Sequence, residues 1–222
     1  NVKEVPEVVI HVVHYGMVEQ MSLASTEYPR EVDEFVKAGF TAIPSTEVKP
    51  PRIKEAKVAF ECKVNEVKSL GDQGGAGNLV ICEVIAVHVD EEIFDQNGVI
   101  DPNKIDLVAR LGGNWYSRTN GTALFEIPKP LRTMGIGVDQ IPEEIRNSPV
   151  LTGNNLGRLG NVEQLPSAEE IKVFGESPIL EEMRLRFKND YDSWIYHIHE
   201  LAKQLLEKGE VEAAWKTLLQ KL

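Results

Sequence analysis

The chain has 222 residues, 42% of them hydrophobic, and a formal net charge of -11. This composition excludes a disordered or fibrous protein and suits one domain with an extension. Because so many carboxylates would repel a phosphate backbone, the charge also argues against a nucleic-acid partner.

The first predicted element is a strand over the apolar residues 8–13. Residues 17–25 follow as a short helix with one apolar side, and residues 32–37 form a second helix that ends at Gly39. Residues 44–51 then make a proline-stiffened loop. Since the chain starts with Asn and enters the first strand almost at once, we expect that the sequence begins inside a longer protein.

Two long strands form the centre of the predicted sheet. Residues 58–66 alternate apolar and polar side chains, which is the period of a half-buried strand. Residues 79–89 carry apolar side chains on both faces, which predicts a strand at the centre of a barrel or sheet. The glycine-rich residues 70–78 join them, either as an ordinary hairpin turn or as a loop that lies against a flat ligand.

A second group of glycines and aromatic residues follows the hairpin. Residues 101–106 predict a brief helix with proline at its first position. Residues 107–116 then combine an arginine, two glycines and two aromatic side chains. Such a cluster either forms a wall for a planar ligand or completes the core. Residues 122–127 are the last predicted strand.

The composition changes after residue 127. Prolines, glycines and asparagines predict a long structured loop or a surface-wrapping arm over residues 128–165. A helix that begins at residue 178 and ends at Gly209, and a second helix from residue 210, each carry an apolar stripe, so they predict an antiparallel hairpin. We expect its excess apolar surface to dock on the β domain or on a second subunit. The predicted division is therefore residues 1–165 and residues 166–222.

Few side chains have the spacing of a metal or catalytic site. Cys62 and Cys82 are too few for a disulfide framework and lie in predicted strands. The histidine pairs at 11 and 14 and at 197 and 199 diverge, so we predict no metal site. No nucleophile elbow, Walker loop or dinucleotide fingerprint occurs in its required context. With no membrane span or signal-peptide pattern, we expect a cytoplasmic protein without a membrane partner.

Three sequence blocks together point to a family. They are Val-Ile-His-Val-Val at residues 9–13 followed by Met-Ser-Leu-Ala-Ser at 21–25, Gly-Asn-Leu-Val-Ile-Cys-Glu-Val at 77–84, and Ala-Arg-Leu-Gly-Gly-Asn-Trp-Tyr at 109–116. In their order and spacing they resemble the flavin reductase-like, FMN-binding split-barrel proteins. This resemblance covers most of residues 1 to about 165. It implies a mainly β fold with an α extension: a Greek-key split β-barrel plus a C-terminal helical hairpin.

The resemblance also implies a cofactor and a site. Members of the family are usually homodimers that hold FMN in a cleft at the subunit interface, and the FMN carries hydride. Asn78 falls near a position where many flavin reductases have a histidine close to the nicotinamide. The cofactor-binding residues that the resemblance implies are Ser22, Ser25, Thr26, Asn78, Arg110, Trp115 and Tyr116.

Two functions follow from this resemblance. The first is an oxidoreductase that transfers hydride between NADH or NADPH and flavin, with free flavin, a monooxygenase partner or another electron acceptor downstream. The alternative is a non-catalytic flavin-binding or electron-carrier module, or a truncated relative with impaired FMN binding. The family's first strands and its loop for the FMN phosphate precede the first residue here. A version extended at the N-terminus is therefore expected to bind FMN more tightly.

Overall fold

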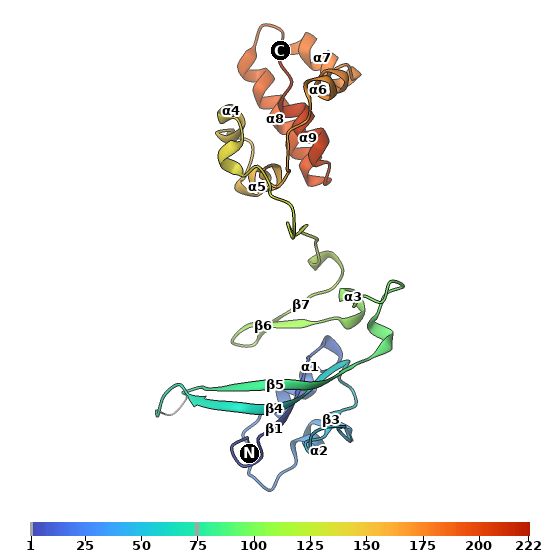
Figure 1. Cartoon of the computed structure of the whole chain (residues 1–222), viewed down its shortest axis with the longest axis vertical. Coiled ribbons are helices and arrows are strands. Elements are labelled where there is room, and N and C mark those ends of the chain that lie inside the picture. The colour runs from blue at the N-terminus through green and yellow to red at the C-terminus, as the bar shows by residue number, and fades with distance from the viewer. Residues whose placement is uncertain (1, 74–75) are drawn as a thin grey trace. The chain divides into compact units, whose positions relative to one another are not determined.

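The computed structural model describes residues 2–73 and 76–222 (Figure 1). The chain forms two compact units, residues 1–126 and residues 127–222. The first unit is rich in strands and the second is helical, which confirms the predicted β domain with an α extension. The predicted boundary at residue 165 lies inside the second unit, because residues 128–165 carry helices that pack on the C-terminal ones.

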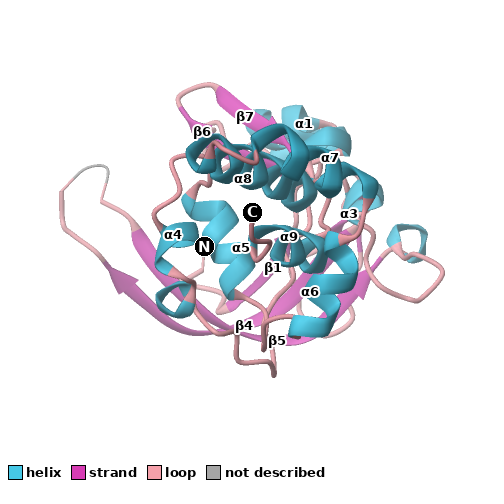
Figure 2. Ribbon diagram, turned by 90° about the horizontal axis from the view of Figure 1, so that it is seen from above, coloured by secondary structure: helices cyan, strands magenta, loops and turns pink. Residues whose placement is uncertain are grey.

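The first unit is organised around a three-stranded antiparallel sheet with the order β1-β4-β5. The predicted hairpin is confirmed, and Val58 pairs with Val89 at its open end. Figure 2 shows β4 and β5 as a long curved pair. The strands of this sheet are β1 (Glu7–His11), β4 (Val58–Ser69) and β5 (Asn78–Val89).

Strand β5 lies at the edge of this sheet in the described part of the chain, although its pattern predicted a central strand. Its apolar side chains are correspondingly exposed, Val84 at 50% and Val87 at 55%. One face of β4 meets the core through Val58 and Cys62, as its alternation predicted. The prediction that the other face meets water is wrong at the start of the strand, because Ala59 and Glu61 are buried there at 3% and 0% exposed. Gly74 and Gly75 of the predicted connector lie outside the described residues.

Short elements surround this sheet. The first short sheet is β2 (Ala42–Ile43) with β3 (Arg52–Ile53), and the second is β6 (Val108–Gly112) with β7 (Trp115–Arg118). The helices are η1 (Tyr15–Met17), α1 (Val18–Ala24), α2 (Glu34–Ala38), η2 (Glu91–Ile93), α3 (Pro102–Ile105) and η3 (Gly121–Ala123).

The predicted strand over residues 122–127 is wrong. The segment begins within η3 and then continues without regular structure. Phe125 and Ile127 are 80% and 71% exposed, so the apolar side chains that suggested a strand have no sheet to pack on. A strand forms only where a neighbouring strand satisfies its backbone groups, and sequence alone does not supply that neighbour.

The second unit consists of helices joined by short loops. Their bounds are η4 (Val138–Gln140), α4 (Glu143–Arg146), α5 (Gly153–Gly160), α6 (Ala168–Gly175), α7 (Pro178–Phe187), α8 (Tyr191–Glu207) and α9 (Val211–Leu218). The predicted hairpin is confirmed as α8 and α9, and Gly209 between them has a φ of 82°. Residues 128–165, predicted as a loop or arm, contain α4 and α5.

The helix predicted from residue 178 to Gly209 is two helices rather than one. The break follows Phe187, and Asp190 caps the new helix because its side chain accepts hydrogen bonds from the backbone N–H and the hydroxyl of Ser193. Aspartate is a strong N-cap, so it favours a fresh start over a continuous helix. Because the apolar side chains keep a regular spacing across the break, the sequence pattern predicted a single helix.

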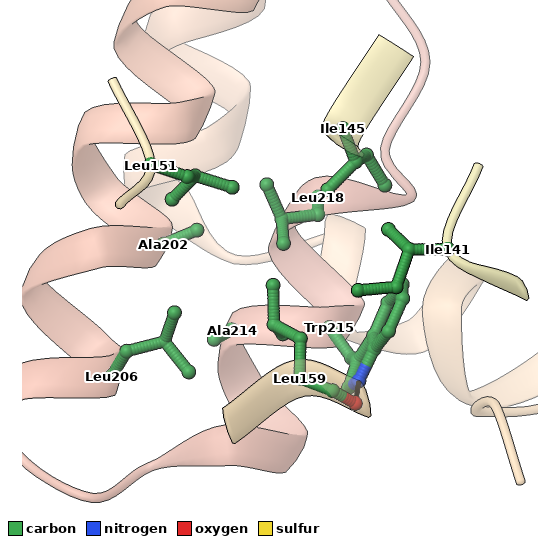
Figure 3. Packing of buried hydrophobic residues seen from close by; sticks show 9 residues of the cluster. All are labelled: Ile141, Ile145, Leu151, Leu159, Ala202, Leu206, Ala214, Trp215 and Leu218. Atoms are coloured by element: carbon green, nitrogen blue, oxygen red, sulfur yellow. Dashed lines mark hydrogen bonds between the residues drawn. The ribbon is translucent and has the colours of Figure 1, made fainter. Parts of the chain in front are cut away.

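The apolar surface of the hairpin is buried within the second unit itself (Figure 3). Trp215 is 1% exposed, and its indole N–H donates to the carbonyl of Leu159 in α5 over 3.1 Å. Trp194 is fully buried and packs with Leu180 of α7. Helices α4 to α7 therefore cover the two tryptophans within the second unit, whereas Tyr191 remains 53% exposed. Docking of the hairpin on the β domain or on a second subunit stays a prediction.

Among the described residues, no helix is long and apolar enough to cross a membrane. The same part of the chain holds no cluster of histidine, cysteine and carboxylate side chains that could bind a metal ion.

Candidate functional site

A pocket of about 480 Å³ lies in the first unit, between η1 and α1 on one side and the β6–β7 hairpin on the other. Its lining is mainly aromatic and cationic, and Glu19 of α1 contributes one carboxylate. The side chains that define its chemistry are Tyr15, Ser22, Arg110, Trp115, Tyr116 and Arg118. Polar and aromatic groups converge here in a concave site, which is the usual form of a small-ligand pocket.

The β6–β7 hairpin shapes one wall of this pocket. Gly112 and Gly113 turn the chain with φ angles of 98° and 54°, a backbone that glycine adopts without strain. Arg110 pairs with Tyr116 across the hairpin, so these two side chains share one face of the ladder. Trp115 is 76% exposed, so its ring is accessible to a ligand.

Arg118 is held in place by Asp106. Its Nε and Nη2 donate to the two carboxylate oxygens of Asp106 over 2.8 and 2.7 Å. This pairing lowers the pKa of Asp106 and raises the pKa of Arg118, because each charge stabilises the other. The guanidinium also lies 3.9 Å from the centre of the Tyr15 ring. The result is a cation with a fixed orientation in the pocket wall.

Tyr15, Asp106 and Arg118 were not among the site residues predicted from the sequence. The sequence held a signal for Arg118, which lies two residues after Tyr116, because residues two apart on a strand point to the same side. The contribution of Asp106 could not be found that way. It has a φ of 56°, and this left-handed backbone at the end of α3 is a tertiary outcome.

The structure brings together four of the seven residues that the resemblance implied, namely Ser22, Arg110, Trp115 and Tyr116. The other three lie outside the pocket lining. Ser25 follows α1, and its hydroxyl donates to the carbonyl of Met21 over 2.9 Å. Thr26 continues the same turn, since its N–H donates to Leu23. Asn78 begins β5 opposite Ser69 and is exposed.

A second polar cluster surrounds Glu61, which is fully buried on β4. Its carboxylate accepts hydrogen bonds from the backbone N–H groups of Thr46, Glu47 and Val48 over 2.8, 2.6 and 3.1 Å. The His88 ring lies 2.6 Å away. Burial alone would raise the pKa of Glu61, but these hydrogen bonds outweigh it and lower the pKa to about 2. The cluster fastens the loop before β3 to the sheet.

The antiparallel sheet and its aromatic, cationic pocket define a β domain suited to a planar anionic ligand. Residues 1–106 match the family described as the flavin reductase like domain. Over these residues the chain is similar to that family. The β6–β7 wall of the pocket follows directly after the matched residues.

Curated relatives match more than half of the chain. A protein from Aquifex aeolicus is 35% identical over 127 residues, which are 57% of this chain and 63% of the relative. One from Halalkalibacterium halodurans is 36% identical over 132 residues, covering 59% of this chain and 62% of the relative. Both are described as uncharacterized. The match therefore spans less than two thirds of these relatives.

Solved structures show the same fold. Nitrilotriacetate monooxygenase component B from Bacillus cereus has a TM-score of 0.52 and 27% identity, over 57% of this chain and 62% of that one. A candidate flavin reductase with a split barrel domain from Shewanella frigidimarina has a TM-score of 0.50 and 27% identity, over 58% and 63% of the two chains. These similarities confirm the split-barrel class that the sequence predicted.

Proposed function

We propose that the first unit binds FMN in the pocket between α1 and the β6–β7 hairpin. The observation that carries this proposal is the convergence of Arg110, Arg118 and three aromatic side chains on one pocket of a flavin reductase-like domain. The planar isoalloxazine ring of FMN can pack on the aromatic side chains, and its anionic ribityl phosphate can bind the arginines.

The side chains divide into two roles. Tyr15, Trp115 and Tyr116 offer ring faces and edges to a planar group, and the exposed Trp115 has the most free surface. Arg118 is oriented by Asp106. Arg110 makes only a long contact of 3.4 Å to the carbonyl of Gly113, so most of its donors remain for an anion. The hydroxyl of Ser22 adds a neutral donor at the α1 side.

The chemistry that bound FMN supplies is hydride acceptance and onward electron transfer. The protein contributes binding, orientation and exclusion of water. We propose NADH or NADPH as the hydride donor and free flavin, a monooxygenase or another electron acceptor as the recipient. The similarity to a protein named as a monooxygenase component supports a monooxygenase partner.

We also propose that the active form is a homodimer that uses β5. This strand has a free edge in the described sheet, and its apolar side chains Leu79, Ile81 and Val84 are 48%, 42% and 50% exposed. A second copy that pairs along this edge would satisfy the backbone groups and cover the apolar surface. Val87→Asp should convert the dimer to monomer in light scattering, whereas Val36→Asp, on exposed α2, should not.

A second function, flavin binding without turnover, has one observation in its favour. Asn78, near a position where many flavin reductases have a histidine, is exposed at the start of β5 and lies outside the pocket lining. The asparagine supplies no titratable ring. An electron carrier that depends on another protein for its reduction would not need one.

Two measurements test these functions. Titration of the protein with FMN, followed by flavin fluorescence, should give saturable binding. Arg110→Gln should weaken it about tenfold, because one charge-assisted contact is lost. Arg30→Gln removes an 82% exposed arginine elsewhere in the unit and should leave binding unchanged. Absence of binding, or equal losses in both variants, would overturn the FMN proposal.

Oxidation of NADH or NADPH by the FMN-loaded protein then separates the two functions. Turnover that rises with added free flavin supports the reductase. Saturable FMN binding without NAD(P)H oxidation supports the carrier.

A further inference from the structure

The helical unit contains a pocket of its own, of about 750 Å³. It lies between α4, α7 and the last residues of the chain, and every lining residue belongs to the second unit. The proposed flavin site makes no use of it. Its volume lies within the range of small-molecule pockets.

One side of this pocket is cationic. Arg184, Lys188 and Lys221 line it, and none of them pairs with a carboxylate among the residues that the structure describes. The anionic side chain in the lining is Glu144, whose carboxylate accepts a hydrogen bond from the hydroxyl of Tyr191 over 2.9 Å. A positively charged pocket is notable on a chain whose net charge is -11. Free cations in a concavity raise the local concentration of anions.

Arg184 is fixed by neutral partners. Its Nη1 donates to the carbonyl of Gly175 over 2.6 Å, and its Nη2 donates to the side-chain oxygen of Gln220 over 2.5 Å. Nε makes a longer contact to the carbonyl of Lys221. These acceptors orient the guanidinium without neutralising its charge. The cation is thus held in position, and two of its five N–H donors remain for a ligand.

The other side of the pocket is apolar. Ile145 and Leu218 form the floor and also belong to the buried core shown in Figure 3. Leu185 and Leu222 stand at the rim and are 74% and 42% exposed. Exposed leucines beside a concave apolar floor leave a surface that a ligand can cover.

We propose that this pocket binds an amphipathic organic acid, with its carboxylate at Lys188, Lys221 and Arg184 and its hydrocarbon or aryl body on Ile145, Leu185 and Leu218. A carboxylate matches a single cluster of cations, and the apolar floor requires an apolar body of at least several carbons. The helical unit is then a sensor or carrier of small organic acids. This proposal is independent of FMN binding in the first unit.

Octanoate is a suitable probe, and isothermal titration of the full chain measures its binding. Octan-1-ol has the same chain without the charge and should bind at least tenfold more weakly. Inorganic phosphate has charge without an apolar body and should not compete. Octanol that binds as tightly as octanoate, or phosphate that displaces octanoate, would overturn the proposal.

Paired variants locate the site. Lys188→Gln with Lys221→Gln should weaken octanoate binding about tenfold, because two exposed charge contacts are lost. Lys203→Gln with Lys208→Gln makes the same charge change on α8 and at its C-cap, away from the pocket lining, and should have no effect.

Leu185→Ser tests the apolar side. The leucine is largely exposed, so the fold should tolerate the change while octanoate binding weakens. Arg184 is left intact because it also holds Gln220 and Lys221 in place. Equal affinities in the two double variants, or no saturable octanoate binding to the unmodified chain, would refute the site.

Discussion

Replacing Glu61 with glutamine removes the buried charge that holds three consecutive backbone N–H groups. Glutamine keeps the size of the side chain but replaces one acceptor oxygen with an N–H₂ group, which would face the donors of Glu47 and Val48. At least one buried N–H then loses its acceptor, and the His88 ring loses its anionic partner. We expect the loop at residues 46–48 to detach from β4.

The size of the effect follows from the pKa of Glu61. A pKa lowered to about 2 from the ordinary 4.5 corresponds to roughly 3 kcal/mol of folding free energy at neutral pH. Glu61→Gln should therefore destabilise the first unit by about 2 to 3 kcal/mol at pH 7. Because the folded-state pKa is lowered, this contribution is complete above pH 4.5 and is lost as the pH falls towards 2. The difference between the two proteins should shrink over the same range.

Amide hydrogen exchange provides a local assay. Protection of the Thr46, Glu47 and Val48 amides should fall in Glu61→Gln, and urea unfolding should give the free-energy difference at each pH. Glu66→Gln, an exposed position on the same strand, is the matched control and should change neither quantity. Unchanged protection of these amides, or a free-energy difference between the two proteins that is as large at pH 3 as at pH 7, would refute the assigned role of the carboxylate.

Three further predictions concern two buried side chains of the second unit and the pocket of the first unit. Trp215→Ala should destabilise the second unit by about 3 to 5 kcal/mol, seen by calorimetry, because it empties a buried site and leaves the Leu159 carbonyl without its donor. Burial lowers the pKa of His199, so the contribution of this neutral ring to stability is complete above pH 6.5 and falls below it. Urea unfolding from pH 8 to 5 should show this fall in the free energy of unfolding. His199→Gln should flatten the pH dependence. Asp106→Asn should weaken FMN binding roughly threefold to tenfold in the fluorescence titration, because Arg118 loses its bidentate partner. An Asp106→Asn protein with unchanged affinity would show that the orientation of Arg118 does not matter.

The sequence predicted those elements whose pattern is local. The alternation in residues 58–66 predicted β4, and Gly209 predicted the turn between α8 and α9. It did not predict the end of α7, because an apolar stripe continues through the break and only the cap at Asp190 marks it. Burial of the hairpin by α4 to α7 was missed for a similar reason. Those helices are short, and short helices depend on tertiary packing more than on their own pattern.

The candidate site was predictable in part. The resemblance placed Arg110, Trp115 and Tyr116 in one block, and they do share one pocket with Ser22. The pairing of Arg118 with Asp106 has no signal in the sequence, since it depends on a left-handed backbone at Asp106 and on the register of β6 with β7. Contacts of this kind arise only once the chain has folded.

The register of β1 on β4 also bears on the order of folding. His11 pairs with Ala59 and Glu7 with Lys63, so this pairing closes a loop of about fifty residues. The β4–β5 hairpin and the α8–α9 pair join segments that are close in sequence and have little loop entropy to lose. We therefore expect those two hairpins to form early and β1 to dock late. The chain would reach its native sheet through a step limited by loop closure.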